Sequence, residues 1–179
     1  MNSKIEIWKP VKNYPDYQVS NFGNVMGKND QLLKAGKDKD GYLLVVLCQN
    51  KLNKSMRVHR LVAETFDLPK RADQYSVDHI DGCKSNNNIN NLRWANRSEQ
   101  QFNQDIYKNN TTGYKGVYFT KGLKKPYRSM ISVHGKSQFL GYFQTPEQAS
   151  QAREKFAQEH HGQFYRPIIN NYGTININN

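Results

Sequence analysis

An adjacent Asp-His pair, Asp78 and His79, has the residue types and spacing that could do chemistry. It lies in the segment VDHIDGCKSNNNINNLRW, residues 77–94, where a polar loop rich in glycine and asparagine leads to Asn91 and an apolar closure. A histidine can accept a proton from water, and a neighbouring carboxylate offers a hard oxygen to a divalent cation on a phosphate. Hydrolysis of a phosphodiester with a single metal ion needs these two groups.

The composition of the chain indicates which kind of phosphodiester such a pair would act on. The chain has 179 residues, which allow one compact domain or two or three small ones, and its formal charge of +11 favours nucleic acid as the partner. Aromatic residues make up 12% and suit a surface that touches sugars or bases. There is no apolar run that could span a membrane and no signal-peptide core. Two cysteines give neither a disulfide framework nor a paired-cysteine zinc pattern, so we expect an intracellular, reduced protein.

The first part of the chain predicts short strands followed by a helix. Residues 7–50 predict short strands separated by turns. Residues 7–26 alternate apolar and polar positions between Pro, Asn and Gly breaks, and residues 42–50 are the strongest strand pattern. Residues 57–68 change to a helical pattern with Leu61, Val62, Thr65 and Phe66 on one apolar face, and a proline at 69 stops it.

The central part predicts a strand, a long loop, a second strand and a helix. A short strand ends at the Asp-His pair, and residues 88–94 lead into the second strand. Asn96 with Glu99 forms a helix-capping pattern, and the helix runs to about Tyr107. Gln100, Asn103 and Tyr107 share one face of it, because steps of three and four residues align on a helix.

The last part predicts three antiparallel strands and one helix. GYKGVYF, YRSMISV and SQFLGYF alternate with a period of two, and Thr145 with Pro146 begins a helix that ends near Gly162. Ala149, Ala152 and Phe156 form its narrow apolar stripe. The fold class is therefore α+β. The expected modules are an N-terminal β-rich DNA-binding unit at 1–55, a central unit at 56–107, a linker at 108–112, a sheet-and-helix unit at 113–168 and a frayed tail at 169–179.

Three segments resemble known families. HRLVAETF at 59–66, VDHIDG at 77–82 and NNNINNLRWANRSEQ at 86–100 together resemble the HNH homing endonucleases of phages and mobile introns. IWKPVKNYPDYQVSNFGNV resembles the nuclease-associated modular domain that precedes such cores. GYKGVYF, YRSMI and FLGYFQTPEQASQA resemble the plant ethylene-response-factor DNA-binding domain.

The first resemblance implies a ββα-metal core and a DNA endonuclease that cleaves phosphodiester bonds with a metal. It also implies a homing or mobile-element enzyme, placed in the host cytoplasm or nucleoid if it is phage-encoded. His79 would be the general base, Asp78 a metal ligand, and Asn91 the brace of the loop that holds His79.

The third motif residue, usually Asn or His, is Gln100 in this chain, and Asn103 one turn further is the competing ligand. Such a ligand set suits Mg²⁺, with Mn²⁺ as the alternative, and suits Zn²⁺ poorly. His59 is expected to pack in the interior or lie near DNA rather than to bind metal.

Double-stranded DNA is the expected partner, with no membrane and no evident protein partner. One active site per chain favours nicking or a dimer, and both remain open. A DNA-binding regulator that has lost the chemistry is the alternative, because Gln100 departs from the family pattern. An RNA-binding protein is the second alternative, favoured by the tyrosine-rich composition. The basic side chains that we expect on DNA are Lys34, Lys37, Arg57, Arg60, Arg93, Arg97, Lys115, Lys121, Lys124, Lys125 and Arg128.

Overall fold

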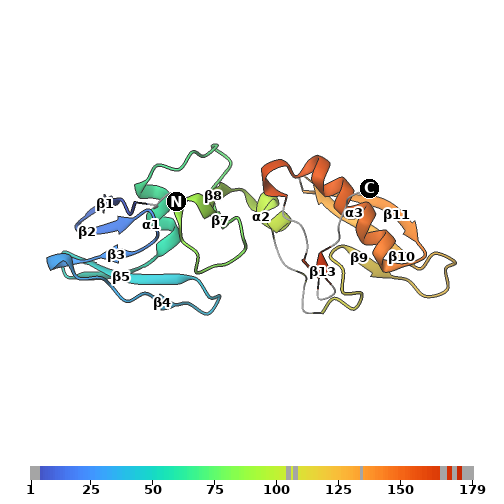
Figure 1. Cartoon of the computed structure of the whole chain (residues 1–179), viewed down its shortest axis with the longest axis horizontal. Helices are drawn as coiled ribbons and strands as arrows, with labels where there is room; N and C mark the ends of the chain where they lie inside the picture. The colour runs from blue at the N-terminus through green and yellow to red at the C-terminus, as the bar shows by residue number, and fades with distance from the viewer. Residues whose placement is uncertain are drawn as a thin grey trace. The chain divides into compact units, whose positions relative to one another are not determined.

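The chain forms two compact units, residues 1–96 and residues 97–179 (Figure 1). The computed structural model describes residues 5–103, 106, 109–133, 135–165, 169–170 and 173–174. Each unit combines small antiparallel sheets with helix, so the predicted α+β class is confirmed. Within these described ranges, no helix is both long enough and apolar enough to cross a membrane.

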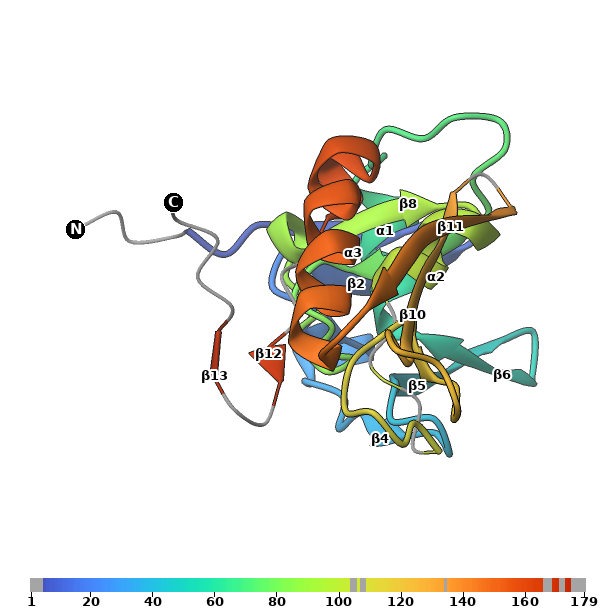
Figure 2. The same cartoon turned by 90° about the vertical axis from the view of Figure 1, so that its right-hand side faces the viewer.

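The first unit is built from three small antiparallel sheets and one α-helix. The sheets are β1-β2-β3, β4-β5-β6 and the pair β7-β8, and Figure 2 shows β4, β5 and β6 side by side. The elements are β1 (Trp8–Val11), β2 (Tyr14–Ser20), β3 (Val25–Met26), η1 (Lys28–Asp30), β4 (Gly36–Lys37), β5 (Leu43–Gln49), β6 (Leu52–Arg57), α1 (Val58–Thr65), β7 (Ser76–His79), η2 (Ile89–Asn91) and β8 (Leu92–Ala95).

Helix α1 supplies the centre of the hydrophobic core of the first unit. Leu61 and Val62, predicted on its apolar face, are 2% and 0% exposed. Burying one aliphatic side chain of this size stabilises a fold by about 1.5–3 kcal/mol. Val45 of β5 and Trp94 of β8 belong to the same cluster as the helix. The N-terminal strands and the Asp-His hairpin therefore share one core.

Helix α1 ends several residues before Pro69, the residue expected to stop it. Its last residue is Thr65, and Asp67 then takes a left-handed conformation with a φ of 50°. The Leu68 N–H donates to the Ala63 carbonyl at 3.0 Å. This bond closes the last turn and satisfies a carbonyl that would otherwise have no partner inside the helix.

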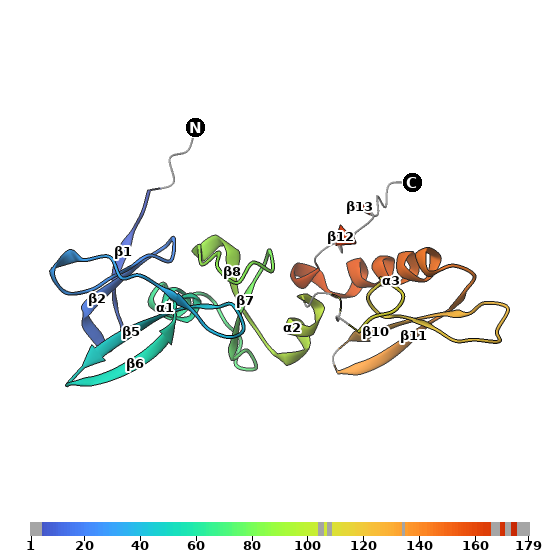
Figure 3. The ribbon, with the colours of Figure 1, turned by 90° about the horizontal axis from the view of Figure 1, so that it is seen from below.

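The second unit contains the predicted three-stranded sheet and its helix. The strand order is β11-β10-β9, and Figure 3 shows α3 along one side of β10 and β11. The Thr145 hydroxyl accepts from the Gln148 N–H at 3.3 Å, as the capping pattern predicts. The elements are α2 (Arg97–Asn103), β9 (Val117–Phe119), β10 (Tyr127–Val133), β11 (Lys136–Phe143), α3 (Pro146–His160), η3 (Gly162–Phe164), β12 (Ile169–Asn170) and β13 (Gly173–Thr174).

The apolar stripe predicted on α3 is wrong in part. Ala149 is buried as predicted, but Ala152 and Phe156 are only half-buried. The Phe156 ring instead stacks on the His160 ring, with centroids 3.8 Å apart. The buried face of the helix is Ala149, Ser150, Arg153, Glu154 and Ala157. Because this face carries polar side chains, apolar periodicity in the sequence does not identify it as the buried face.

The compact units divide at a different place from the sequence modules. Helix α2 lies in the second unit, where the Phe102 ring stacks on the His161 ring with centroids 3.7 Å apart. The helix ends at Asn103, and Ile106 is not helical; residues 104, 105 and 107 of the predicted helix lie outside the described part of the chain. In the predicted tail, β12 pairs with β13, and residues 175–179 are likewise outside it. The module boundaries at 55 and 107 remain a proposal about the sequence.

Candidate active site

The hairpin of β7 and β8 determines which way the candidate catalytic side chains point. Its register pairs Asp78 with Arg93 and His79 with Leu92. Successive side chains of a strand point to opposite faces. Burial follows that alternation, because His79 is buried and Asp78 is half-buried. His79 therefore enters the interior of the first unit, and Asp78 lies on the other face beside Arg93.

The His79 imidazole is enclosed by two rings and held by one amide. It is 4% exposed, and its ring centroid lies 5.8 Å from that of Tyr42 and 5.1 Å from that of His59. Its Nε2 atom lies 3.0 Å from the Asn87 Oδ1 atom. An amide oxygen can only accept, so this hydrogen bond requires a proton on Nε2 and leaves the lone pair on Nδ1.

Burial lowers the pKa of His79 below its ordinary value of 6.5. The hydrogen bond to Asn87 and the nearby charge of Asp78 act in the opposite direction but do not outweigh burial. The imidazole is therefore neutral at neutral pH, the state in which it can accept a proton.

The turn after His79 is fixed by a pair of side chains, Asp81 and Asn91. The Asn91 amide donates to Asp81 Oδ1 at 2.9 Å and to the Asn86 carbonyl at 2.8 Å. In return, the Asn91 Oδ1 atom accepts from the Asp81 N–H at 3.1 Å. Burial raises the pKa of the Asp81 carboxyl, but hydrogen bonds from Asn86 and Asn91 lower it by more. The pKa of this carboxyl is therefore below its usual value. Asn91 thus braces the loop through both backbone and side-chain bonds.

The turn between β2 and β3 supports Asn87 from the other side. A Cβ added at Gly23 would stand 2.5 Å from the Asn87 Cβ, and Gly23 has a φ of +87°. The Ile89 N–H also donates to the Asn21 carbonyl at 2.8 Å. The residue that holds His79 is therefore itself held by the N-terminal strands.

Asp78 is engaged by an arginine rather than open to solvent. Arg93 Nη2 lies 2.8 Å and Arg93 Nε 2.9 Å from the same carboxylate oxygen, Oδ2. Both side chains are 12% exposed. Pairing at this depth compensates the carboxylate charge, which would otherwise be costly to bury.

Two family models match successive stretches of the chain. The model of the NUMOD4 motif matches residues 6–58, and a model of the HNH endonuclease matches residues 56–102. H-N-H endonuclease F-TflII of Escherichia phage T5 is 31% identical over 137 residues, which cover 75% of this chain and 71% of the relative. The chain belongs to the HNH endonuclease family.

Other relatives of this HNH family chain match over shorter stretches. DNA endonuclease I-HmuI of Bacillus phage SP01 is 41% identical over 99 residues, covering 54% of this chain and 56% of the relative. Uncharacterized HNH endonuclease L245 of Acanthamoeba polyphaga mimivirus is 42% identical over 87 residues, covering 48% of this chain but only 26% of the relative. A solved structure concerning DNA binding and cleavage by the HNH homing endonuclease I-HmuI is 41% identical, covers 51% of this chain and 53% of that chain, and has a TM-score of 0.48.

The two candidate amide ligands of the HNH family chain lie on α2. Gln100 is half-buried and Asn103 is 7% exposed, and both belong to the second unit, whereas Asp78 and His79 belong to the first. The assignment of a metal to either amide remains a proposal. Among the described residues, no group of three or more His, Cys, Asp and Glu side chains gathers in a way that could hold a metal ion.

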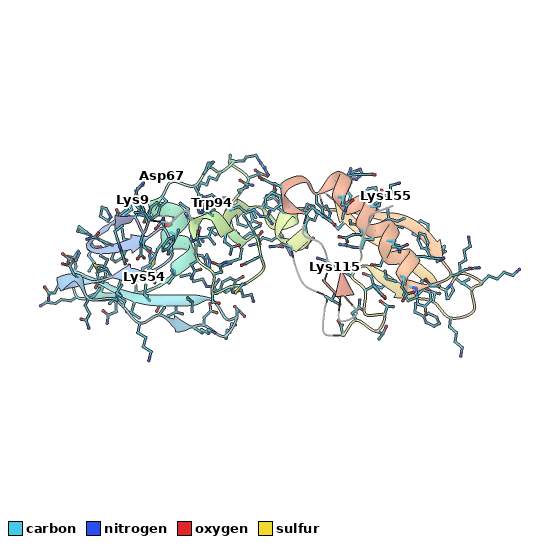
Figure 4. The ribbon with its side chains drawn as sticks, in the orientation of Figure 1. Lys9, Lys54, Asp67, Trp94, Lys115 and Lys155 are labelled. Atoms are coloured by element: carbon cyan, nitrogen blue, oxygen red, sulfur yellow. The ribbon has the colours of Figure 1, made fainter. Side chains whose placement is uncertain are left out.

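The basic side chains expected on DNA differ in their surroundings. Arg93 is bound to Asp78 instead, and Arg57 and Arg60 pair with Asp38 and Glu64 at 2.6 Å and 2.9 Å while remaining exposed. Figure 4 shows lysines on both units, among them Lys54 in the first and Lys115 in the second. The exposed members of the expected set are Lys34, Lys37, Arg57, Arg60, Arg97, Lys121, Lys124 and Lys125, and the half-buried ones besides Arg93 are Lys115 and Arg128.

Reasoning from sequence missed two partners in this site. Asn87 stands between two other asparagines, and no spacing distinguishes it from Asn86 or Asn88. The Arg93–Asp78 pair did leave a signal, because opposite charges flank the loop at positions that a hairpin brings together.

His59 behaves as a buried interior residue, as expected. It is 5% exposed, and its Nδ1 atom has no hydrogen-bond partner among the described residues. Burial, with the neighbouring His79 as a smaller cause, lowers the pKa of His59 to about 3. The unfolded chain therefore binds more protons than the folded chain between pH 6.5 and pH 3. Stability is full above pH 6.5 and is lost as the pH falls through this window.

We expect His59→Phe to remove much of the acid sensitivity of the first unit. With a pKa near 3 in the folded state, His59 would cost the wild type about 2 kcal/mol between pH 7 and pH 5. Urea unfolding followed by tryptophan fluorescence tests this, because Trp8 and Trp94 are the two tryptophans and both lie in the first unit. The control is His160→Phe, an exposed site on α3. Equal pH slopes in wild type and His59→Phe would contradict the assignment.

Proposed function

We propose that this chain is a metal-dependent DNA endonuclease that hydrolyses phosphodiester bonds, with His79 as the general base. The observation that carries the proposal is the bond from His79 Nε2 to Asn87, because it directs the imidazole lone pair to Nδ1. Membership of the HNH endonuclease family supports the reaction class. The relative I-HmuI is named as a DNA endonuclease, which supports DNA as the substrate.

In the proposed step, water attacks the phosphorus while His79 Nδ1 accepts one of its protons. A bond forms between the water oxygen and phosphorus, and the bond from phosphorus to the leaving sugar oxygen breaks. The leaving oxygen takes up a proton from solvent. A buried, fixed imidazole suits this role, because its ring does not have to reorient when the proton moves.

By the family pattern, Asp78 would be a ligand of the divalent cation, and Gln100 or Asn103 would be the third motif residue. The donor types fit a hard cation, because carboxylate and amide oxygens are ligands that Mg²⁺ accepts, with water completing its coordination. Mn²⁺ would accept the same oxygens. When bound, such an ion neutralises charge on the phosphate. Arg93 already engages one oxygen of Asp78 and fixes the direction of the carboxylate.

Double-stranded DNA would be bound by the expected Lys and Arg side chains that remain exposed. Several phosphate contacts make binding fall steeply with salt, because each releases counterions. The phage relatives support a homing or mobile-element enzyme acting inside a host cell. A regulator that binds DNA without cutting is the second candidate, and Gln100 at a position where the family has Asn or His favours it.

We expect His79→Ala to lower the rate of plasmid nicking by about 10²–10⁴-fold, the usual contribution of a general base. Binding of duplex DNA and the unfolding midpoint should change little, because the proton transfer affects the transition state rather than the bound state. Purified protein, supercoiled plasmid and Mg²⁺, with a chelator control, give the measurement. Wild-type nicking by His79→Ala would remove the role of His79, and retention of plasmid without cutting by the wild type would support the regulator.

Asn87→Ala should slow cleavage by about tenfold or more, because His79 loses the bond that sets its tautomer. The KM for DNA should not change, since Asn87 is 3% exposed and acts through His79. Asn90→Ala is the matched control in the same loop, where the side chain is exposed. A change in KM with an unchanged kcat would show that Asn87 acts on DNA binding instead.

The greater exposure of Gln100 makes it the stronger candidate for the third motif position. Gln100→Ala should then abolish cleavage, while Gln100→Asn retains or raises it by restoring the shorter amide of the family. Asn103→Ala should retain cleavage in protein that is folded by circular dichroism. The measurement is cleavage by the three variants at increasing Mg²⁺. If Asn103→Ala abolishes cleavage and Gln100→Ala retains it, Asn103 is the ligand instead.

A further inference from the structure

Tyr42 is a half-buried ring beside the Asp-His pair of the first unit. Its centroid lies 5.8 Å from that of the His79 ring. Burial is the main cause that raises the pKa of the Tyr42 hydroxyl, Arg57 acts against it, and the charge of Asp78 raises it again. The ring is therefore a neighbour of the imidazole and lies within the field of the carboxylate.

Two cationic side chains lie over the Tyr42 ring. The Arg57 guanidinium carbon is 4.5 Å from the ring centroid, and the Lys84 Nζ atom is 4.9 Å from it. A positive charge at such a distance is attracted by the electron-rich face of the ring. The charge of Arg57 is compensated within the protein, because its Nη2 atom lies 2.6 Å from a carboxylate oxygen of Asp38 and 3.6 Å from one of Asp40.

The charge of Lys84 is not compensated in this way by any residue that the structure describes. Its Nζ atom donates to the Asp40 carbonyl at 2.7 Å, and that acceptor is neutral. Asp81, in the same loop as Lys84, uses both its carboxylate oxygens for hydrogen bonds within that loop. An ammonium has more N–H donors than one carbonyl uses. Lys84 is exposed and can therefore donate to an anion from solvent.

The Lys84 side chain lies along the turn that leads into β5. A Cβ added at Gly41 would stand 3.9 Å from the Lys84 Cδ atom. That turn is itself fixed, because the Gly41 N–H donates to the Asp38 carbonyl at 2.9 Å and the Tyr42 N–H donates to the Asp38 carboxylate at 3.0 Å. Ordering a long lysine side chain opposes binding. In this protein the carbonyl and the ring order the ammonium in advance.

The positive charge of Lys84 also acts on the His79 imidazole. Burial is the main cause that lowers the pKa of His79, and the charge of Lys84 acts in the same direction. The two side chains come from one short loop, which the bonds between Asp81 and Asn91 brace. An anion that approaches the imidazole therefore approaches the ammonium as well.

We propose that Lys84 binds the phosphate that enters beside His79, donating from Nζ to a non-bridging oxygen, while the Tyr42 ring holds the ammonium in place. Negative charge on these oxygens grows when water attacks the phosphorus, so a fixed cation stabilises the transition state more than the bound substrate. Lys84 is not among the basic side chains expected on DNA, because its place over Tyr42 depends on a contact between distant parts of the chain. The inference rests on the proposed function in one respect, that a phosphodiester of DNA is the substrate.

The contact is tested without cleavage, on the full chain with a chelator in place of metal. Binding of a labelled duplex is measured at increasing salt, and Lys84→Gln should lower the slope of log affinity against log salt by about 0.9, one phosphate contact on a duplex. The imidazole signals of His79 in nuclear magnetic resonance spectra, identified by their loss in His79→Ala, should shift when duplex is added to the wild type and shift less in Lys84→Gln. Lys28→Gln is the matched control and should change neither measurement, because Lys28 is an exposed lysine of the same unit whose charge is paired with Asp16 at 2.9 Å.

The effect on the transition state is tested by single-turnover nicking of supercoiled plasmid with Mg²⁺. Protein in saturating excess removes differences in affinity from the measured rate. Lys84→Gln should lower this rate by about 10²–10³-fold, the usual loss when one donor to developing negative charge is removed. Lys84→Arg should recover part of the rate, because the charge remains. Tyr42→Leu should lower the rate by about two- to fivefold, the loss of an exposed cation–π contact, and Tyr42→Phe should restore it, because the ring remains.

An unchanged salt slope in Lys84→Gln would overturn the proposal, and a lower unfolding midpoint in the same variant would then show that Lys84 only ties its loop to the turn at Asp40. A lower slope with an unchanged shift of the His79 signals would also overturn it, by assigning the contact to a phosphate elsewhere on the duplex. A chain that shows both binding effects but does not nick keeps this inference and loses the proposed function. A chain whose nicking requires His79 but is the same in Lys84→Gln does the reverse.

Discussion

The candidate site depends on a close approach of two backbones that only a glycine permits. Asn87 can hold His79 because Gly23 leaves room for it, and any side chain at Gly23 would collide with the Asn87 Cβ at 2.5 Å. The positive φ of Gly23 would strain other residues in addition. The N-terminal strands thus do more than extend the surface. They hold in place the asparagine that orients the imidazole, and they share a hydrophobic core with the Asp-His hairpin.

The loop between the two hairpin strands keeps its shape through polar bonds rather than apolar packing. Asp81 accepts from the Cys83 N–H and from the amides of Asn86 and Asn91, so both its oxygens are used within the loop. A carboxylate satisfied in this way keeps its charge and has little need of a cation. Asp78 on the preceding strand is therefore the better ligand of the two, although Arg93 shares its oxygen.

Sequence patterns predicted the elements well because each depends on local chemistry. The apolar run of β5, the Thr145 cap of α3 and the three strands of the second unit all follow from neighbours in the chain. Contacts between distant residues were not predictable in this way. Asn87 is chosen over its two neighbours by the position of Gly23. The buried face of α3 is the one that packs on β10, where the Ser129 hydroxyl donates to the Ala149 carbonyl at 2.7 Å.

The first unit buries the groups proposed for chemistry, whereas the second unit exposes large aromatic rings. In the first unit, the groups proposed for chemistry are buried and their geometry is fixed, which suits a proton transfer that tolerates little displacement. In the second unit, the core that buries Tyr114, Val117 and Ala149 is small, while large rings remain in solvent. Exposed rings in such number do not stabilise the fold that carries them. Residues 106–146, which carry these rings, contain no Asp or Glu, so the rings lie in a stretch whose charged residues are all basic.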